Sequence, residues 1–173
     1  VQYKNTTGKY NENSADMPVD NTRHYLQTST EEDALLEMVM SNFDNVVVII
    51  NTCNAMELGF LDDDRIDAAI AVNGTGQKVL KGEVNPSGRL TNTQPYDMKT
   101  DPSYVNAGMQ TAYTGNYTVY AEDIYVGYKW YETADEEGFF GNVTNNYGTG
   151  YDAVVQYPFG YGLSYTDFEW EAE

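Results

Sequence analysis

The first half of the chain alternates amphipathic segments with short, uninterrupted apolar runs. Residues 31–43 carry apolar side chains at helical spacing, behind a Ser29 and Glu32 pair with the spacing of a capping box. The face is formed by Leu35, Leu36, Met38, Val39 and Phe43. Val46–Ile50 is entirely β-branched and Ala68–Val72 is a second apolar run. Such runs are typical of strands buried on both faces of a parallel sheet.

Shorter helical signals separate and follow these strands. Residues 61–66 suggest an acidic helical turn, and a short helix should end near Lys81. Asn85-Pro86 then stops any helix, since the residue before proline is disfavoured in the α region. This order of helices and strands predicts an α/β fold, specifically a partial α/β sandwich with a mainly parallel sheet.

The second half has a different composition. Thirteen of the sixteen tyrosines lie between Tyr96 and Tyr165. Alternating Tyr and Val near 117–131 predicts a strand, and 138–150 is interpreted as a loop too polar for the core. We therefore expect a Tyr/Gly-rich C-terminal arm built of strands and loops. Residues 1–22, polar and without period, are interpreted as loop.

Five motifs occur in a fixed order. They are Val46–Asn51 (VVVIIN), Ala55–Leu58 (AMEL), Gly82–Leu90 (GEVNPSGRL), Glu122–Tyr131 (EDIYVGYKWY) and Tyr157–Thr166 (YPFGYGLSYT). Together they resemble the C-terminal half of glycoside hydrolase family 3, the β-glucosidase family. The resemblance runs from about His24 to Phe168.

The resemblance implies a division of the chain. Residues 1–95 would form part of the sandwich, and 96–165 an arm that wraps it. Residues 166–173 would begin a fibronectin type III-like strand. One departure stands out, because the family has a longer helix where this chain offers only Lys78–Lys81 before the NPSG motif. Roughly two turns are missing there, at about 3.6 residues per turn.

Retaining glycosidases use two carboxyl groups about 5–5.5 Å apart, a nucleophile and an acid/base. The resemblance implies that the nucleophile is an Asp on a preceding barrel, and this chain contains no such barrel or motif. It also implies an acid/base Glu on a sandwich loop, and Glu12 lies close to that place. Asn replaces the flanking glycines of the family motif, and Asp16 is one residue too far away. The alternative is that Glu12 is a solvated loop carboxylate.

Aromatic rings of the arm are candidate sugar-binding residues, because rings stack on the apolar faces of sugars while polar groups bind hydroxyls. The substrate-binding candidates are Tyr125, Tyr128 and Trp130; Tyr131, Tyr157 and Tyr161 offer the same chemistry. The favoured alternative is that these rings cover the sandwich as a packing layer.

The remaining polar candidates favour structural roles. The acidic runs 62–64 and 135–137 lack metal-loop spacing, so no metal site is predicted. His24 is the only histidine and has no nucleophile near it in sequence. Glu57 follows a strand end, a common ligand position in α/β proteins, but packing is favoured. Cys53 is interpreted as an inert buried thiol. No cofactor is implied, because acid/base cleavage of a glycoside needs none.

The net charge of the chain limits the classes of partner that it can bind. The net charge of −18 disfavours nucleic acid and anionic membrane surfaces, and is compatible with a neutral saccharide. No apolar stretch approaches the ~20 residues of a membrane span. Extracellular and cytoplasmic locations both stay open, since the lone cysteine cannot form an internal disulfide.

These observations leave more than one function open. The first is a portion of a β-glucosidase-like hydrolase, inactive alone, that needs the missing barrel domain to cleave a β-glucoside. The alternative is a non-catalytic carbohydrate-binding or self-assembling structural protein with a homo-oligomer partner. A third is that the sequence is a fragment of a longer protein.

Overall fold

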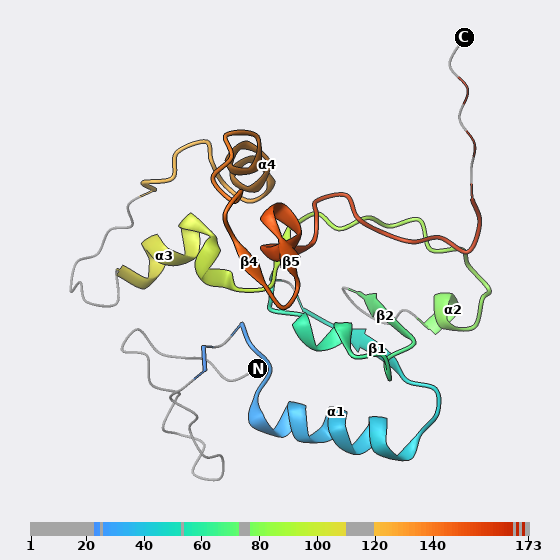
Figure 1. The fold of residues 1–173 in the computed structure, drawn as a ribbon. Helices are drawn as coiled ribbons and strands as arrows, with labels where there is room; N and C mark the ends of the chain where they lie inside the picture. The colour runs from blue at the N-terminus through green and yellow to red at the C-terminus, as the bar shows by residue number, and fades with distance from the viewer. Residues whose placement is uncertain are drawn as a thin grey trace.

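The computed structural model describes residues 23–24, 26–52, 54–72, 77–109, 120–167, 169 and 171 (Figure 1). The helices are α1 (Thr30–Asn42), α2 (Gln77–Leu80), α3 (Pro102–Met109) and α4 (Tyr128–Glu136), with 3-10 turns at Gly59–Asp62, Met98–Thr100 and Gly150–Ala153. The strands are β1 (Val47–Ile50), β2 (Ala68–Ala71), β3 (Gln94–Pro95), β4 (Thr144–Asn145), β5 (Gly148–Thr149) and β6 (Val155–Tyr157). They pair as β1–β2, β3–β6 and β4–β5, of which only β1–β2 is parallel.

The first helix and the first sheet confirm the sequence pattern. Ser29 Oγ accepts the Glu32 N–H at 3.1 Å while the Glu32 carboxylate accepts the Ser29 N–H at 2.8 Å, which completes the predicted capping box. β1 and β2 pair in parallel from Val47 with Ala68 onward. The two predicted apolar runs therefore share one sheet.

The prediction that β1 is buried on both faces is wrong for the described residues. Val46 and Ile50 are buried, but Val47 and Ile49 are 49% and 51% exposed. Val47 and Ile49 alternate along the strand and so lie on the same face of the sheet, which the described residues leave partly uncovered. The apolar face of α1 is only partly covered: Leu35 and Met38 are exposed, and the helix contains no fully buried residue.

Charged contacts hold α1 beside the sheet. Arg65 donates to both carboxylate oxygens of Glu37 at 2.9 and 3.0 Å and to Asp63 Oδ2 at 2.7 Å. These hydrogen bonds hold the pKa of Glu37 below its ordinary value and lower the pKa of Asp63 to about 2. The Asp67 carboxylate accepts the Val46 N–H at 2.7 Å. Ion pairing thus replaces part of the apolar contact that α1 lacks.

The Arg65 contacts predict that part of the folding stability is lost at acidic pH. Carboxylates with folded pKa values below their unfolded values stabilise the fold above the unfolded pKa, and that stability is lost as the pH falls through the folded pKa. We expect Arg65→Met to lower the urea midpoint at pH 7, with the gap to wild type closing between about pH 5 and pH 2.

Arg89→Met is the matched control for this effect. Arg89 donates to the backbone carbonyl of Gly162, which does not titrate. Its gap to wild type should therefore persist at acidic pH. A gap for Arg65→Met that is equally insensitive to pH would contradict the assignment.

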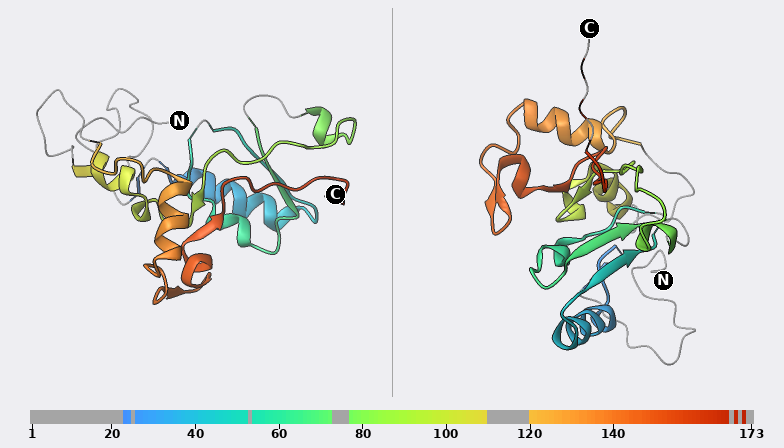
Figure 2. Two further views of the ribbon diagram at one scale, coloured as in Figure 1. Left: turned by 90° about the horizontal axis from the view of Figure 1, so that it is seen from above. Right: turned by 90° about the vertical axis from the view of Figure 1, so that its right-hand side faces the viewer.

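The main apolar core lies in the second half, around α4. This helix is drawn in orange in Figure 2. Tyr131 is fully buried and packs with Ala134 of the same helix. The other buried members are Phe140, Val154 and Val155. The predicted strand over 117–131 is wrong where the structure describes it, because α4 begins at Tyr128; residues 110–119 lie outside the described residues. The two buried residues of α4, Tyr131 and Ala134, are three positions apart, and this spacing is the sequence signal that indicates a helix.

Two other segments of the arm differ from their predictions. Residues 138–150 contain the β4–β5 hairpin and the buried Phe140, so this segment is not a loop outside the core. α3 was not predicted. Its signal is Asp101-Pro102, where Asp101 Oδ1 accepts the Ser103 N–H at 2.8 Å and proline occupies the first helical turn.

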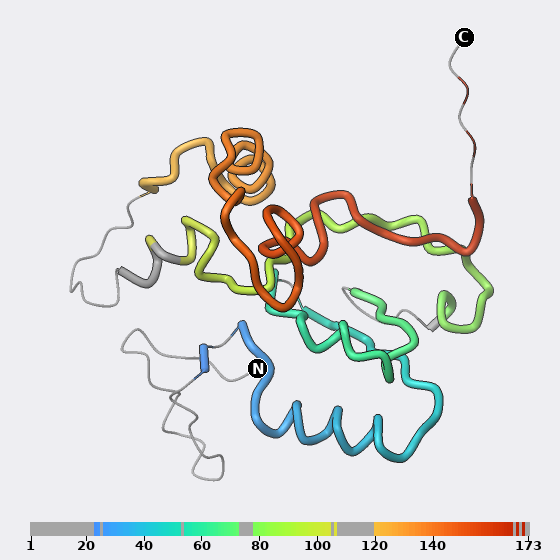
Figure 3. The backbone as a smooth tube through the Cα atoms, in the orientation of Figure 1, coloured from blue at the N-terminus to red at the C-terminus, as the bar shows by residue number. Residues whose placement is uncertain are grey.

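The NPSG and FGYGLSYT motifs lie side by side (Figure 3). Asn85 Oδ1 accepts from Ser164 Oγ at 3.0 Å and from the Tyr165 N–H at 2.9 Å. Asn85 Nδ2 donates to Thr166 Oγ1 at 2.7 Å. Pro86 lies outside any helix, after α2 has ended at Leu80, as predicted.

A glycine allows this close approach. A Cβ added to Gly162 would lie 2.7 Å from the Gly88 carbonyl oxygen, whereas one on Gly88 meets nothing within 4 Å. We expect Gly162→Ala to destabilise the protein by about 1–3 kcal/mol through overpacking, and Gly88→Ala to be nearly neutral. Thermal unfolding of the two variants measures the difference. Equal melting temperatures would show that the two motifs do not touch.

The predicted division of the chain at residues 95 and 165 stays a prediction. β3, at the end of the first part, pairs with β6 of the arm, so the two parts share a sheet. Among the described residues between 165 and 171, none is assigned to a strand.

Candidate functional site

A cavity of about 400 Å³ lies where the first half of the chain meets the arm. Gln27 and Glu57 line it from the first half. Tyr96 and the residues that follow it form another wall, and Tyr147 lines it from the hairpin. The cavity therefore brings together segments that are far apart in sequence.

Glu57 is the most connected polar side chain of this cavity. Its Oε2 accepts from Gln27 Nε2 at 2.7 Å, and its Oε1 accepts the Met98 N–H at 3.0 Å. His24 Nε2 lies 3.0 Å from the same Oε1. The Leu26 N–H donates to His24 Nδ1 at 3.3 Å, so Nε2 carries the proton that points at Glu57.

These contacts give Glu57 and His24 structural roles. Their side chains are only 14% and 12% exposed, and the carboxylate already accepts three donors. A carboxylate so occupied is poorly placed to transfer protons. The neighbouring residues extend the junction, since the Met56 N–H donates to Gln94 Oε1 at 3.1 Å and the Leu58 carbonyl accepts from Gln156 at 3.1 Å.

Two tyrosines form the aromatic side of the cavity. The rings of Tyr96 and Tyr147 stack with centroids 3.7 Å apart and planes 6° apart. Burial, together with a hydrogen bond to the Asp62 carboxylate, raises the pKa of Tyr96. Its hydroxyl therefore stays protonated at neutral pH. Asn145 Oδ1 accepts the Tyr147 N–H at 2.9 Å and fixes the hairpin turn that carries this ring.

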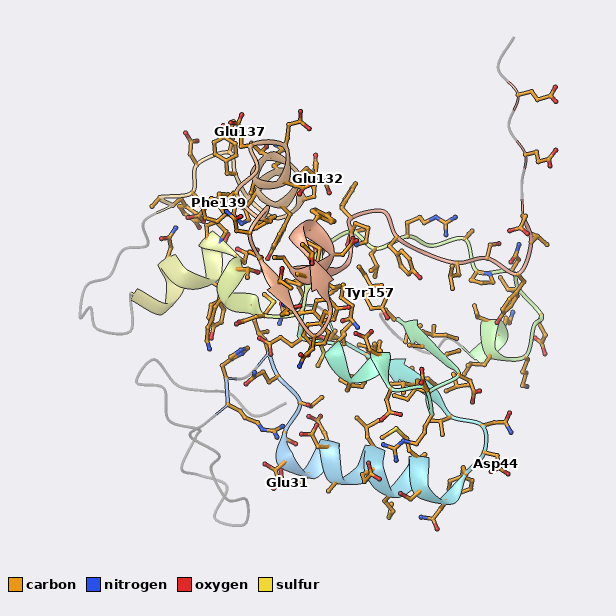
Figure 4. The ribbon with its side chains drawn as sticks, viewed as in Figure 1. Glu31, Asp44, Glu132, Glu137, Phe139 and Tyr157 are labelled. Carbon is orange, nitrogen blue, oxygen red and sulfur yellow. The ribbon has the colours of Figure 1, made fainter. Side chains whose placement is uncertain are left out.

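The predicted sugar-binding residues lie elsewhere and do not form one platform. Tyr125 and Tyr128 are exposed, and the Tyr128 ring stacks on Phe159 at 4.4 Å. Trp130 packs against the core and its Nε1–H donates to the Thr100 carbonyl at 2.9 Å. Figure 4 shows the side chains of Glu132 and Glu137 beside α4 and that of Glu31 on α1 at opposite sides of the molecule.

The acid/base candidate Glu12 lies outside the described residues. Among the residues that are described, no group of three or more His, Cys, Asp and Glu side chains is placed to hold a metal ion. In the same part of the chain, no helix has the length and apolar character to cross a membrane.

Sequence reasoning missed Tyr96 and Tyr147 as partners. They are 51 positions apart and belong to segments with no shared pattern. The local signals were the polar turn Asn145–Gly148 and the end of β3, and neither indicates that the two rings meet.

Comparison with known proteins identifies the family. The family model described as "Glycosyl hydrolase family 3 C-terminal domain" matches residues 4–128. A beta-glucosidase of Ruminococcus albus is 37% identical over 156 residues, which cover 86% of this chain and 14% of that protein. The chain belongs to the glycosyl hydrolase family 3 C-terminal domain family.

Other relatives of this family 3 domain agree. The thermostable beta-glucosidase B of Acetivibrio thermocellus is 31% identical over 153 residues, 86% of this chain and 18% of that protein. The crystal structure of a beta-glucosidase from Paenibacillus barengoltzii aligns with a TM-score of 0.62 at 32% identity, over 84% of this chain and 15% of that one. The chain thus spans less than a fifth of the relatives it matches, and the α/β fold class expected from the motifs is confirmed.

The Glu57 junction predicts a large effect on stability. Glu57→Ala would leave His24, Gln27 and the Met98 N–H without their acceptor, and should destabilise the family 3 domain by about 2–3 kcal/mol. The exposed Glu83, whose side chain makes no hydrogen bond or ion pair among the described residues, provides the matched control Glu83→Ala. Urea unfolding followed by tryptophan fluorescence measures both. Equal urea midpoints for the two variants would show that the contacts of Glu57 do not stabilise the fold.

Proposed function

We propose that this chain is a portion of a β-glucosidase-like hydrolase that cleaves a β-glucoside only together with a barrel domain. The observation that supports this most directly is the 37% identity to the Ruminococcus albus beta-glucosidase over a segment that is only 14% of that protein. The chemistry requires a second carboxylate that this segment does not provide.

The proposed role of this chain in the reaction is proton transfer. Glu12 would protonate the leaving oxygen as the glycosidic bond breaks, while an Asp of the barrel attacks the anomeric carbon. The same residue would then take a proton from the attacking water when the glycosyl-enzyme is hydrolysed. No cofactor enters either step.

The arm would contribute to substrate binding through its exposed rings. Tyr125 and Tyr128 remain accessible and are able to contact a sugar that is bound beside the arm. Trp130 would support them indirectly, because its indole is anchored to Thr100 and to the core.

The exposed face of the β1–β2 sheet supports the proposal that another domain or chain packs against it. Val47 and Ile49 expose about half of their surface. Full burial of a Val or Ile side chain contributes about 1.5–3 kcal/mol. Covering the exposed half of each would therefore stabilise a complex by on the order of 1 kcal/mol. A further domain of the same enzyme fits this face, and a second copy of the chain is the other occupant.

The activity prediction has two parts. The isolated 173-residue chain should hydrolyse p-nitrophenyl β-glucoside no faster than its Glu12→Gln variant. Spliced into the Ruminococcus albus beta-glucosidase in place of the matching segment, the chain should support turnover. There Glu12→Gln should lower kcat by about 10²–10⁴, the usual contribution of a general acid.

Glu31→Gln in the same hybrid is the control, because Glu31 lies exposed in the first turn of α1. It should leave kcat unchanged. Turnover by the isolated chain that disappears in Glu12→Gln would overturn the proposed need for a barrel. An active hybrid insensitive to Glu12→Gln would remove Glu12 from the mechanism.

A further inference from the structure

We propose that two copies of this chain form a closed dimer, in which the outer side of α1 in one copy lies on the surface around α2 in the other. The outer side of α1, called the α1 surface, consists of Glu31, Leu35, Met38, Phe43 and Asp44. This inference goes beyond the proposed function, because it concerns assembly of the chain with itself and requires neither Glu12 nor a barrel domain.

The outer side of α1 is apolar where a helix that faces only water would be polar. The inner side, with Leu36 and Met40, lines a cavity against the 3-10 turn Gly59–Asp62. On the other side of the helix, Leu35 and Met38 are three positions apart and are 55% and 56% exposed. A surface helix usually carries its apolar residues on one face only. The second apolar side of α1 therefore indicates a partner.

The charges of the α1 surface are all negative. The sequence of α1 contains four acidic residues and no lysine, arginine or histidine. Glu31 and Asp44 are exposed and lie near opposite ends of α1 (Figure 4). Neither side chain makes a hydrogen bond or ion pair with another described residue. A partner that fits this surface combines apolar side chains with basic ones.

The surface around α2 has this composition. It is called the α2 surface and consists of Lys78, Leu80, Lys81, Val84 and Tyr165. Leu80, Val84 and Tyr165 are all exposed. The Tyr165 hydroxyl donates to the Val79 carbonyl at 3.0 Å, and the Tyr165 N–H donates to Asn85 Oδ1 at 2.9 Å. These two bonds place the tyrosine beside α2 and the residues that follow it.

The α2 surface is also a basic part of an acidic chain. Residues 78–89 contain three basic residues and one acid, whereas the whole chain carries a charge of −18. Lys78 and Lys81 are exposed and precede and follow Leu80 in the sequence. Neither ammonium bonds to another described residue. Both are therefore available to a carboxylate of a partner.

A second copy of the chain provides the complement of each surface. Within one copy the α1 and α2 surfaces are both exposed, so neither covers the other. In a two-fold dimer the α1 surface of each copy meets the α2 surface of the other, so the same contact forms twice. The net charge opposes association at long range, but salt screens that repulsion beyond about 8 Å at physiological ionic strength. The pairing of opposite charges at short range then favours this arrangement.

Sedimentation velocity of the full chain at physiological salt tests the proposal. We expect a monomer–dimer equilibrium with a Kd of about 1–100 µM, in the range of a small, transient interface. Lys78→Glu combined with Lys81→Glu should weaken dimerisation about tenfold or more, because like charges then face each other. Glu31→Lys combined with Asp44→Lys should do the same. All four side chains are exposed, so both double variants should keep the fold.

Mixing these two double variants tests whether the two surfaces meet each other. In the mixed dimer each altered surface faces a surface of opposite charge, so dimerisation should return to near the wild-type Kd. Lys99→Glu combined with Lys129→Glu is the matched control, because both lysines are exposed and the net charge changes equally. This control should dimerise as wild type and should not restore dimerisation of the Glu31 and Asp44 variant.

Each outcome decides the proposal. A chain that stays monomeric well above the expected Kd, a dimer that both double variants leave unchanged, or mixed variants that stay monomeric would overturn it. Growth beyond a dimer would contradict the closed arrangement. The hybrid enzyme assay of Glu12 is independent of these measurements, so failure of one proposal leaves the other intact.

Discussion

The carboxylate of Glu57 is the contact on which the arrangement of the chain depends. It accepts from Gln27 and His24 before α1, and from the backbone of Met98 after β3. Gln27 and Met98 lie 30 and 41 positions from Glu57 in the sequence. Three separate segments thus meet at one side chain. A buried carboxylate is costly without donors, so the segments that satisfy it are held together.

The surrounding contacts extend this junction in both directions. The backbone on either side of Glu57 bonds to Gln94 of β3 and to Gln156 of β6. β6 in turn carries Val155 into the core with Tyr131 of α4. The two halves of the chain therefore contact each other through these bonds, and the cavity lined by Tyr96 and Tyr147 lies between them.

Local pattern was sufficient wherever the structure depends on neighbours in sequence. Ser29 and Glu32 predicted the start of α1, the β-branched run predicted β1, and Asn85-Pro86 predicted that no helix continues there. It failed where burial depends on distant segments. The exposure of Val47 could not be predicted because it depends on which distant segments pack over that face of the sheet. Glu57 was singled out after a strand end with a packing role favoured, but its donors could not be predicted because they come from other segments. α4 was missed because alternation of Tyr and Val outweighed the helical step between Tyr131 and Ala134.

The family relationship supports our proposal that this domain carries one side of a hydrolytic site. Complementation in trans tests this most directly. The Ruminococcus albus beta-glucosidase lacking the matching segment would be mixed with increasing amounts of this chain, and hydrolysis of p-nitrophenyl β-glucoside recorded. Our account predicts no turnover from either part alone and a saturable recovery on mixing. Full activity of the shortened enzyme by itself, or of this chain by itself, would contradict it.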